Sequence, residues 1–273
     1  GSGKRSAGRG KLPGNQDGLR GSMTDLADKV CLIAGASTGM GRRTAIHAGA
    51  CGATVICAAR RVDLCEAVAK EIQAAGGQAA ALPFDGVDPA SVDKLLADVE
   101  ASYGCLDGLF NNLGDTLGAS TIDETPLERW EQTLAVNLSS VFYLLRAAIP
   151  LMRASGGGSI VNNSSTAGVQ GIATMADYSA AKWGLIGLSR SAALELGPDN
   201  IRVNVIAPGI IQTEKMEVFR EQSPAIFDKL LADVPIGKFG DMQHVAELVT
   251  WLLSDASGYV NGVTLPIDGG RTA

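Results

Sequence analysis

Residues 30–41 read VCLIAGASTGMG, an apolar run that passes directly into a glycine-rich turn. The run is typical of a strand buried on both faces, and a helical pattern follows the last glycine. Gly35 allows a tight turn, Gly39 lets a pyrophosphate approach the backbone, and Gly41 permits close packing of helix on strand. The helix N-terminus adds amide donors and positive dipole character. The stretch therefore predicts a dinucleotide-binding loop, with further cofactor contacts from Ser37, Thr38 and Met40.

The same alternation of short apolar runs and longer helical patterns continues along the chain. It predicts a doubly wound α/β fold, a seven-stranded parallel Rossmann-type sheet with helices on both faces. Asp63 and Glu66 have the spacing of a capping box at the second helix. The expected strands are 30–34, 53–59, 78–84, 106–111, 158–164, 201–207 and 262–267, and the expected helices lie near 40–51, 63–75, 89–103, 126–153, 176–197 and 241–254.

Composition separates residues 1–22 from the rest of the chain. They hold five basic residues against one acidic residue, seven of the 34 glycines and almost no apolar side chain. Such a segment cannot bury enough surface to order itself, so we expect a disordered leader, an expression tag rather than a native basic arm. Residues 23–273 are expected to form a single dinucleotide-binding and catalytic domain, with a substrate lid near 210–240.

The net charge of −6 conceals a more acidic body, because the leader carries +4 and residues 23–273 carry −10. An acidic body argues against nucleic acid as a partner, unless the basic arm is native. No uninterrupted apolar run reaches the ~18–20 residues that span a bilayer, so no membrane partner is expected. Five scattered cysteines predict reduced thiols in the cytoplasm. Two histidines outside any Cys/His cluster predict no metal site.

The end of the second strand indicates which dinucleotide is preferred. An NAD site places an acidic residue there for the adenosine ribose, whereas this chain has Arg60 and Arg61 and no carboxylate before Asp63. Guanidinium groups suit a 2′-phosphate, so the pair predicts NADP(H), with NAD(H) less favoured. The alternative is a pair of solvated arginines at the start of a helix.

A tyrosine and a lysine four residues apart open the helix expected at 176–197. This spacing places Tyr178 and Lys182 on one helix face. A tyrosine pKa of about 10 is too high for a base at neutral pH, and a nearby cation brings it down. Ser165 follows the expected strand 158–164 and can hydrogen-bond a substrate oxygen. A Tyr/Lys pair alone is usually a surface pair, but its combination with a strand-end serine and a glycine loop predicts a catalytic set.

With these motifs in this order, the chain resembles the short-chain dehydrogenases/reductases from about Leu26 to Gly270. The resemblance rests on the glycine pattern, Asn111-Asn112-Leu113-Gly114, Asn137 in AVNLSS, Ser165 in NNSSTAG, Tyr178-x-x-x-Lys182 and Pro208-Gly209. It implies hydride transfer between a nicotinamide and a carbonyl or secondary alcohol, and assembly as a homotetramer or homodimer. Leu113 departs from the usual small alanine and is expected to crowd the adenosine side.

The resemblance also implies residue roles. Tyr178 is the general acid/base, Lys182 holds the nicotinamide ribose and lowers the pKa of Tyr178, and Ser165 orients the carbonyl. Asn137 relays protons through water to Lys182, and Asp85 accepts from the adenine amino group. The remaining expected cofactor contacts are Gly86, Asn112, Gly114, Pro208, Gly209, Ile211 and Thr213, and the expected substrate contacts are Ser165, Tyr178, Asp115, Val169, Met175 and Met216.

Two functions from different classes are compatible with these features. The first is a ketone reductase or alcohol dehydrogenase that acts on a modestly apolar substrate. The alternative is a catalytically minor dinucleotide sensor or scaffold, since fold does not fix function. The intact set of Ser165, Tyr178 and Lys182 favours the enzyme, because a sensor has no reason to keep all three.

Overall fold

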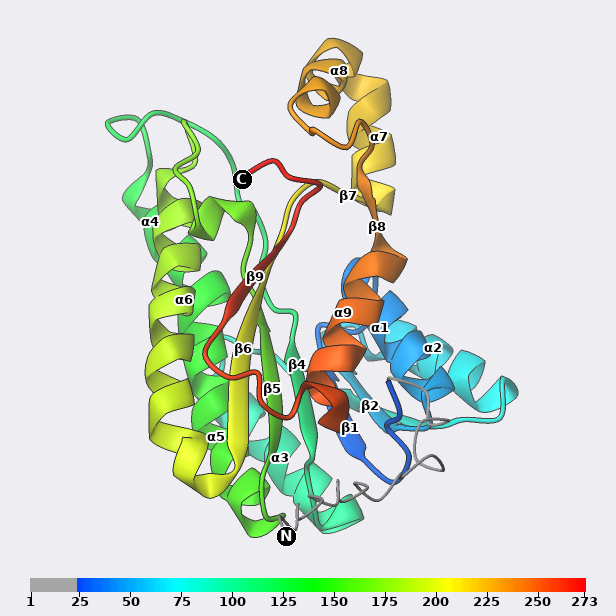
Figure 1. Cartoon of the computed structure of the whole chain (residues 1–273). Coiled ribbons are helices and arrows are strands. Elements are labelled where there is room, and N and C mark those ends of the chain that lie inside the picture. Colours follow the sequence, from blue (N-terminus) through cyan, green and yellow to red (C-terminus); the bar gives the residue numbers. More distant parts are fainter. Residues whose placement is uncertain (1–23) are drawn as a thin grey trace, which may run out of the picture.

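A seven-stranded parallel sheet forms the centre of the molecule (Figure 1). The computed structural model describes residues 24–273, apart from the side chains of residues 214 and 215, and the leader predicted at 1–22 lies outside the described residues. The strand order is β3-β2-β1-β4-β5-β6-β9, as predicted for a doubly wound sheet. The strands are β1 (Val30–Ala34), β2 (Thr54–Ala59), β3 (Gln78–Pro83), β4 (Gly108–Asn111), β5 (Gly158–Asn163), β6 (Ile201–Pro208) and β9 (Thr264–Ile267).

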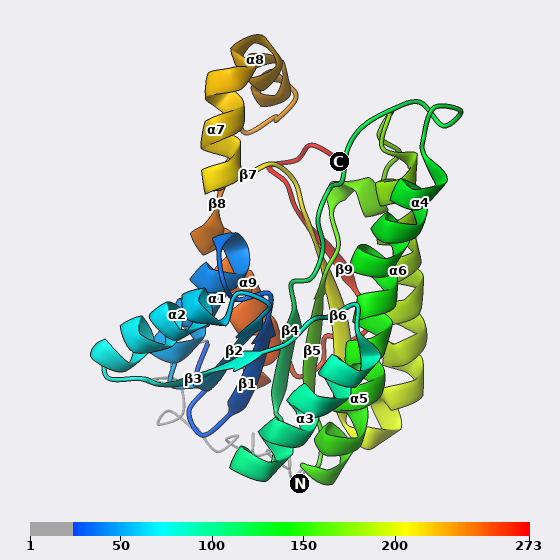
Figure 2. The same cartoon turned by 180° about the vertical axis from the view of Figure 1, so that it is seen from behind.

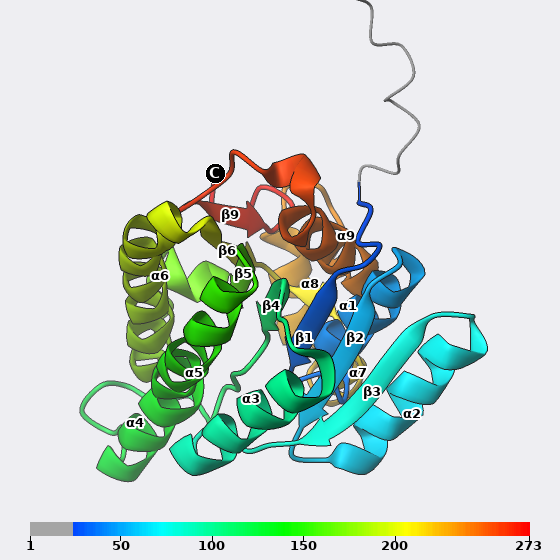
Figure 3. The same cartoon turned by 90° about the horizontal axis from the view of Figure 1, so that it is seen from below.

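Helices cover both faces of the sheet, which Figure 3 shows from below. One face carries α1 (Gly39–Ala50), α2 (Val62–Ala74) and α9 (Met242–Leu253), and the other carries α3 (Pro89–Tyr103), α4 (Leu127–Leu134), α5 (Ser140–Ala154) and α6 (Ala176–Leu196). Each face has its own apolar core, because alternate residues of one strand point to opposite layers. On β1, Leu32 joins the core beneath α3, α5 and α6, while Ile33 joins the core beneath α1, α2 and α9.

The sheet register brings the functional loops to one edge. Ala34 pairs with Ala58 of β2 on one side and with Asn111 of β4 on the other. The glycine loop connects β1 to α1 at this edge. The strand order reverses between β1 and β4, and the crevice at such a switch point is where doubly wound folds bind ligands. The short helices η2 (Thr166–Gly168), η3 (Gly197–Asp199) and η4 (Asp255–Ser257) complete the connections.

The helix expected at 126–153 is a rod of three parts. A π-helical turn, η1 (Ala135–Ser139), separates α4 from α5 and contains the buried Asn137. The rod, Leu127–Ala154, is long and apolar enough by length and composition alone to cross a membrane, as the core helix of a globular protein also can be. Polar residues such as Asn137 and Arg146 interrupt the rod, so it is not the uninterrupted apolar run that the sequence analysis considered.

The capping box predicted for α2 is absent. This helix begins at Val62 with Arg61 as its N-cap, and no side chain makes the cap hydrogen bond. Asp63 therefore lies inside the first turn, two positions past the N-cap. The prediction was wrong because the Arg61 backbone starts the helix while its side chain turns back toward the glycine loop.

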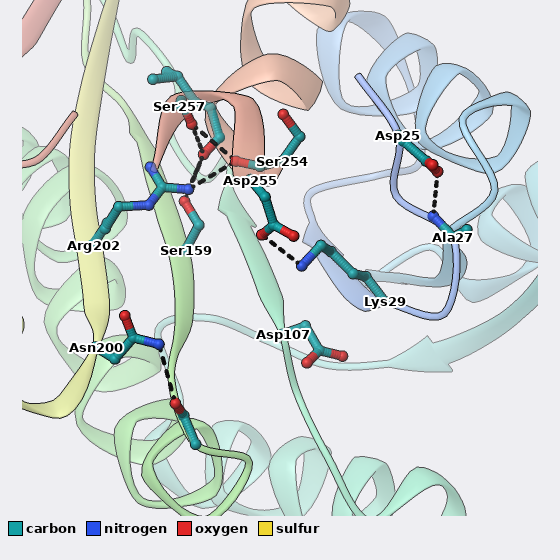
Figure 4. A network of polar contacts seen from close by, with 12 residues as sticks. Asp25, Ala27, Lys29, Asp107, Ser159, Asn200, Arg202, Ser254, Asp255 and Ser257 are labelled. Carbon is teal, nitrogen blue, oxygen red and sulfur yellow. Dashed lines mark hydrogen bonds and ion pairs between the residues drawn. The ribbon is translucent and has the colours of Figure 1, made fainter. Parts of the chain in front are cut away.

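Polar contacts at the amino edge of the sheet fasten the end of α9 to the strands (Figure 4). Arg202 on β6 donates to the carbonyl oxygens of Leu252 and Ser254 at 2.9 and 3.1 Å. Lys29, just before β1, pairs with Asp255 at 2.9 Å. The arginine thus satisfies carbonyls that the helix end leaves without an intrahelical partner. This network lies at the opposite edge from the glycine loop and serves the fold.

The segment predicted as a lid contains two helices. α7 (Glu214–Gln222) and α8 (Pro224–Ala232) follow β7 (Ile211–Gln212), which pairs with β8 (Gly240–Asp241). From both sides the two helices stand above the carboxyl edge of the sheet (Figures 1 and 2). None of the residues of α8 is buried. The hairpin is therefore held chiefly at its base.

Candidate active site

Two adjoining cavities, of about 260 and 270 Å³, lie along the carboxyl edge of the sheet. They share Thr38, Asn112, Leu113 and Gly114, so they form the two ends of one cleft. The first is also lined by Gly35, Ser37, Arg60, Arg61, Asp85, Gly86 and Asp115. The second is also lined by Gly39, Met40, Asn163, Ser165, Tyr178, Lys182, Pro208, Gly209 and Thr213. Most of the predicted cofactor residues therefore share one cleft.

The glycine loop leaves the start of α1 open toward the cleft. Thr38 is the N-cap of α1 and makes no side-chain cap hydrogen bond, whereas Asp88 and Asp241 cap α3 and α9 with their side chains. A Cβ built on Gly39, which has a φ of +58°, would meet nothing within 4 Å. Uncapped amides beside open space are the donor set that a phosphate requires. The loop therefore fits the pyrophosphate of a dinucleotide.

Gly41 has a different task from Gly39. A Cβ at Gly41 would overlap the carbonyl oxygen of Gly35, and it would lie 2.6 Å from the Nδ2 of Asn112. Asn112 in turn donates from Nδ2 to that carbonyl at 3.3 Å. Gly41 is thus the packing glycine, which lets α1 lie against the end of β4 although it does not line the cleft.

The Arg61 side chain crosses from α2 to the glycine loop. One guanidinium nitrogen donates to the hydroxyls of Ser37 and Thr38, at 3.2 Å each. Arg60 also lines this end of the cleft, and both arginines are exposed. The two cations therefore lie where β2 ends, at the position the sequence predicted for an adenosine 2′-phosphate.

Leu113 fits beside the cleft because residue 86 is glycine. A Cβ on Gly86 would lie 2.6 Å from the Cδ1 of Leu113, and Leu113 packs against the core beneath α3 and α5. The crowding expected from Leu113 is thus relieved by the missing side chain opposite it. Nearby, Asp85 accepts from the amide of Val87 at 3.2 Å through Oδ1.

The Lys182 side chain is buried beneath the cleft. Its Nζ donates to the carbonyl oxygen of Asn163 at 2.9 Å and lies 5.6 Å from the centre of the Tyr178 ring. Ser165 caps η2, and its Oγ accepts from the amide of Ala167 at 3.1 Å. This contact leaves the Ser165 hydroxyl proton free to be donated elsewhere. Tyr178, Lys182 and Ser165 all line the same end of the cleft.

Burial controls the ionisation of Tyr178 and Lys182. It lowers the pKa of Lys182 to about 7. It also raises the pKa of Tyr178, although the hydrogen bond with Ser165 opposes this effect. The expectation that Lys182 lowers the Tyr178 pKa was therefore wrong for this structure. The reason is that desolvation disfavours both charged forms, and with a pKa of about 7 only about half of Lys182 is charged at neutral pH.

Asn137 joins the π-turn to the loop after β4. Its Nδ2 donates to the carbonyl oxygens of Asp115 and Thr133 at 2.9 and 3.0 Å, and its Oδ1 accepts from the Asp115 amide at 3.2 Å. A Cβ on Gly114 would lie 2.6 Å from this Oδ1 and 2.8 Å from the Nζ of Lys182. Asn137 and Lys182 thus meet at Gly114, and the water relay between them stays a prediction.

The remaining predicted residues lie around the cleft rather than along it. The Ile211 side chain is buried in the core beneath α9, and Val169 packs against the opposite core. Met175 is the N-cap residue of α6, and Met216 lies in α7. None of these four lines either cavity.

The sequence analysis assigned no role to several polar residues around Tyr178. Asn163 holds Lys182 through its carbonyl oxygen, and its own Oδ1 is buried without a hydrogen-bond partner among the described residues. Asp177, next to Tyr178, is buried and paired with Arg129. The sequence signal that could have indicated a role for Asp177 is its position directly before the tyrosine, at the start of an apolar helix. Among residues 24–273, no group of three His, Cys, Asp or Glu side chains is arranged for a metal ion.

Comparison with known proteins agrees with this geometry. The profile of the family described as enoyl-(acyl carrier protein) reductase matches residues 35–272. Cyclohexanol dehydrogenase from Acinetobacter sp. is 35% identical over 246 residues, which cover 90% of this chain and 96% of that protein. The chain belongs to the short-chain dehydrogenase/reductase family. The 3-oxoacyl-[acyl-carrier-protein] reductase FabG of Thermotoga maritima is 36% identical over 245 residues, 90% of this chain and 98% of that protein.

A solved structure extends the comparison to the fold. A protein from Beutenbergia cavernae, provisionally assigned as an NAD(P)-dependent gluconate 5-dehydrogenase and solved with NADP at low occupancy, superposes with a TM-score of 0.86. It is 31% identical, and the match covers 92% of this chain and 99% of that one. As a short-chain dehydrogenase/reductase, this chain is an oxidoreductase that transfers hydride between a nicotinamide cofactor and a carbonyl or alcohol carbon.

Proposed function

We propose that the protein is an NADP(H)-dependent reductase of a neutral, modestly apolar ketone, which it converts to a secondary alcohol. The observation that carries the cofactor preference is the Arg61 guanidinium over the hydroxyls of Ser37 and Thr38, with Arg60 beside it. A 2′-phosphate at this point would replace neutral acceptors with a charged one. The NADP found with the Beutenbergia cavernae protein supports the same cofactor.

The cofactor supplies the hydride, and the chain holds and protonates the reacting groups. The α1 N-terminus and Gly39 would hold the pyrophosphate, and Lys182 would hold the nicotinamide ribose. The Ser165 hydroxyl donates to the substrate oxygen, where negative charge develops. Because its pKa is raised, Tyr178 stays protonated at neutral pH and donates its proton to the forming alkoxide. This protonation state favours ketone reduction over alcohol oxidation.

Lys182 is suited to restoring the proton that Tyr178 gives up. With a pKa of about 7, it both carries and releases a proton at neutral pH. Asn137 approaches Lys182 at Gly114, on the side of the loop after β4. In keeping with the family resemblance, we propose that Asn137 positions a water molecule that passes protons to Lys182.

The substrate class follows from the relatives and from the lid. Cyclohexanol dehydrogenase is named for a cyclic secondary alcohol, whereas FabG is named for an acyl chain on a carrier protein. Asp115 lines the adjoining end of the cleft, and its charge contributes to the raised pKa of Tyr178, so an acidic group lies near the reacting centre. A carboxylate near the reacting centre and a lid with Met216 and Val218 favour a neutral substrate over an anionic one, and the name of cyclohexanol dehydrogenase supports a ring ketone.

The exposed apolar side chains of the rod and α6 support a homo-oligomer. Phe142 on α5 and Trp183 and Leu194 on α6 are 48%, 52% and 84% exposed. Several apolar side chains of the rod, such as Val141 and Leu144, are buried in the core, and a second copy of the chain would cover the exposed Phe142. We propose a homotetramer or homodimer in the cytoplasm, where the five free cysteines would remain reduced.

The function is tested by following NADPH and NADH oxidation with a panel of cyclic ketones, linear ketones and 3-oxoacyl thioesters. We expect cyclic ketones and NADPH to give the highest kcat/KM, and Tyr178→Phe to lower kcat by several orders of magnitude with NADPH binding near normal. Turnover of Tyr178→Phe near that of the unmodified enzyme would overturn the assignment of the acid. A preference for NADH would overturn the cofactor assignment.

A further inference from the structure

A buried ion pair lies directly beside the catalytic tyrosine. Nε of Arg129, on α4, lies 3.0 Å from Oδ2 of Asp177, in the first turn of α6. The two side chains are 15% and 2% exposed. Each of the other ion pairs described within residues 24–273 has a partner that is more than a third exposed. Solvent therefore screens this pair least.

The Asp177 carboxylate binds three groups, and one of them belongs to Tyr178. Its Oδ2 accepts from Arg129 and from the Thr133 hydroxyl, at 3.0 and 3.1 Å, and its Oδ1 accepts from the Tyr178 amide at 2.9 Å. The carboxylate thus joins the backbone that carries the reacting phenol to helix α4. It also lies at the positive end of the α6 dipole, where an anion is stabilised.

Arg129 extends the connection to the loop between β4 and α4. Its second guanidinium nitrogen donates to the hydroxyls of Ser120 and Thr125, at 2.7 and 3.0 Å. The Ser120 amide donates in turn to the carbonyl oxygen of Thr174 at 2.9 Å. Thr174 has a φ of +67°, which is rare for a β-branched residue and persists where neighbouring contacts hold it.

Thr133 connects the pair to the second catalytic element. Its hydroxyl donates to Asp177, while its carbonyl oxygen accepts from Nδ2 of Asn137, one helical turn further along. Asn137 itself holds both backbone polar groups of Asp115. One buried carboxylate is therefore linked to the helix of Tyr178, the π-turn of Asn137 and the substrate side of the cleft.

We propose that Arg129 and Asp177 are positioning residues, which fix the Tyr178 hydroxyl against Ser165 and tie it to the loop that borders the substrate. A buried ion pair is a poor device for stability alone, because well-packed apolar side chains do as well or better. The pair does fix the orientation of the start of α6, since three donors hydrogen-bond to the Asp177 carboxylate. A misplacement of the reacting groups by about 1 Å can cost a factor of about 10² in rate.

The first test removes the charge without changing the shape. Asp177→Asn should lower kcat for ketone reduction about 10- to 100-fold, while the KM for the ketone and the Kd for NADPH change less than about twofold. Arg153→Gln serves as the matched control, since Arg153 pairs with Asp199 at 2.7 Å on an exposed surface. We expect Arg153→Gln to leave kcat unchanged.

The second test separates positioning from folding. The double replacement Arg129→Met and Asp177→Leu should fold with an unchanged or higher melting temperature, yet lose at least tenfold in kcat. Thr133→Val should lower kcat severalfold, and Thr133→Ser, which keeps the hydroxyl, should restore it. If the folded double variant reduces ketones as fast as the unmodified enzyme, or if Thr133→Val and Thr133→Ser behave alike, the inference is wrong.

This inference rests on the proposed function, and the two can fail separately. An unmodified enzyme that reduces no ketone in the panel would overturn the proposed substrate class. An active enzyme whose kcat does not depend on Arg129 and Asp177 would overturn only the positioning role.

Discussion

The ammonium group of Lys182 donates a hydrogen bond to the carbonyl oxygen of Asn163 at 2.9 Å, and this joins α6 to the end of β5. The lysine is only 2% exposed, so its charged form is desolvated in the folded state, which lowers the stability of the protein. Burial lowers its pKa from 10.5 to about 7, and this has a consequence for stability that can be measured. The buried lysine of the proposed active site therefore lowers the free energy of unfolding.

Replacement of this lysine by methionine should stabilise the protein in a pH-dependent way. Below pH 7 both the folded and the unfolded states hold the proton, so the folded state bears the full cost of a buried charge. Between pH 7 and about 10 the unfolded state binds more protons, so the stability of the unmodified protein rises with pH. We expect Lys182→Met to be more stable by roughly 2–3 kcal/mol at pH 6, with a smaller difference at pH 9.

Thermal and urea unfolding at several pH values would check this prediction. Lys94→Met is a suitable control, because the Lys94 side chain is 73% exposed and its pairing with Asp98 is solvated. A stability difference for Lys182→Met that stays constant from pH 6 to pH 9 would contradict the role of the buried charge.

Arg61 should determine the choice between the two dinucleotides. Loss of a charge-assisted contact to a phosphate costs about 1.5–3 kcal/mol, which corresponds to roughly 10- to 150-fold in affinity. Arg61→Ala should therefore raise the Kd for NADPH by about this factor and leave the Kd for NADH nearly unchanged. Isothermal titration measures both without any substrate. Arg43→Ala is the control, since Arg43 is an exposed arginine of α1 that lines neither cavity; equal losses for both cofactors would contradict the prediction.

The two later glycines of the loop should respond differently to alanine. At Gly39 the new Cβ meets open space, so Gly39→Ala should cost only about 1–2 kcal/mol from its positive φ, yet weaken NADPH binding at least tenfold by occupying the phosphate cradle. At Gly41 the Cβ would overlap the Gly35 carbonyl, so Gly41→Ala should lower both stability and binding. Unfolding and cofactor titration on both variants give the comparison. Normal NADPH binding by Gly39→Ala would show that the cradle lies elsewhere.

The sequence predicted the sheet and the grouping of Ser165, Tyr178 and Lys182 at one site because both depend on local patterns. The strand run at 30–34 is apolar on both faces, and the Tyr178/Lys182 spacing is fixed by the helix. What the sequence could not predict depends on contacts between distant segments. The Asp63 capping box was wrong because α2 begins at Val62, which leaves Asp63 inside the helix, and the Tyr178 pKa is raised rather than lowered because the phenol is buried. Arg129 and Asp177 are 48 positions apart in the sequence, so no local sequence pattern indicates that they pair.

Side chains on the exposed face of the rod and α6 should control assembly. Phe142 and Trp183 are about half exposed, and each buries large apolar area if a second copy covers it. Phe142→Asp and Trp183→Asp would place a charge in that interface, so we expect both to shift the protein toward monomers in sedimentation velocity, with the monomer's secondary structure retained. Ile226→Asp on α8, where Ile226 is 55% exposed but lies away from the rod and α6, should leave the assembly state unchanged. A protein that sediments as a monomer before any substitution would contradict the proposed oligomer, and the apolar face would then need another partner.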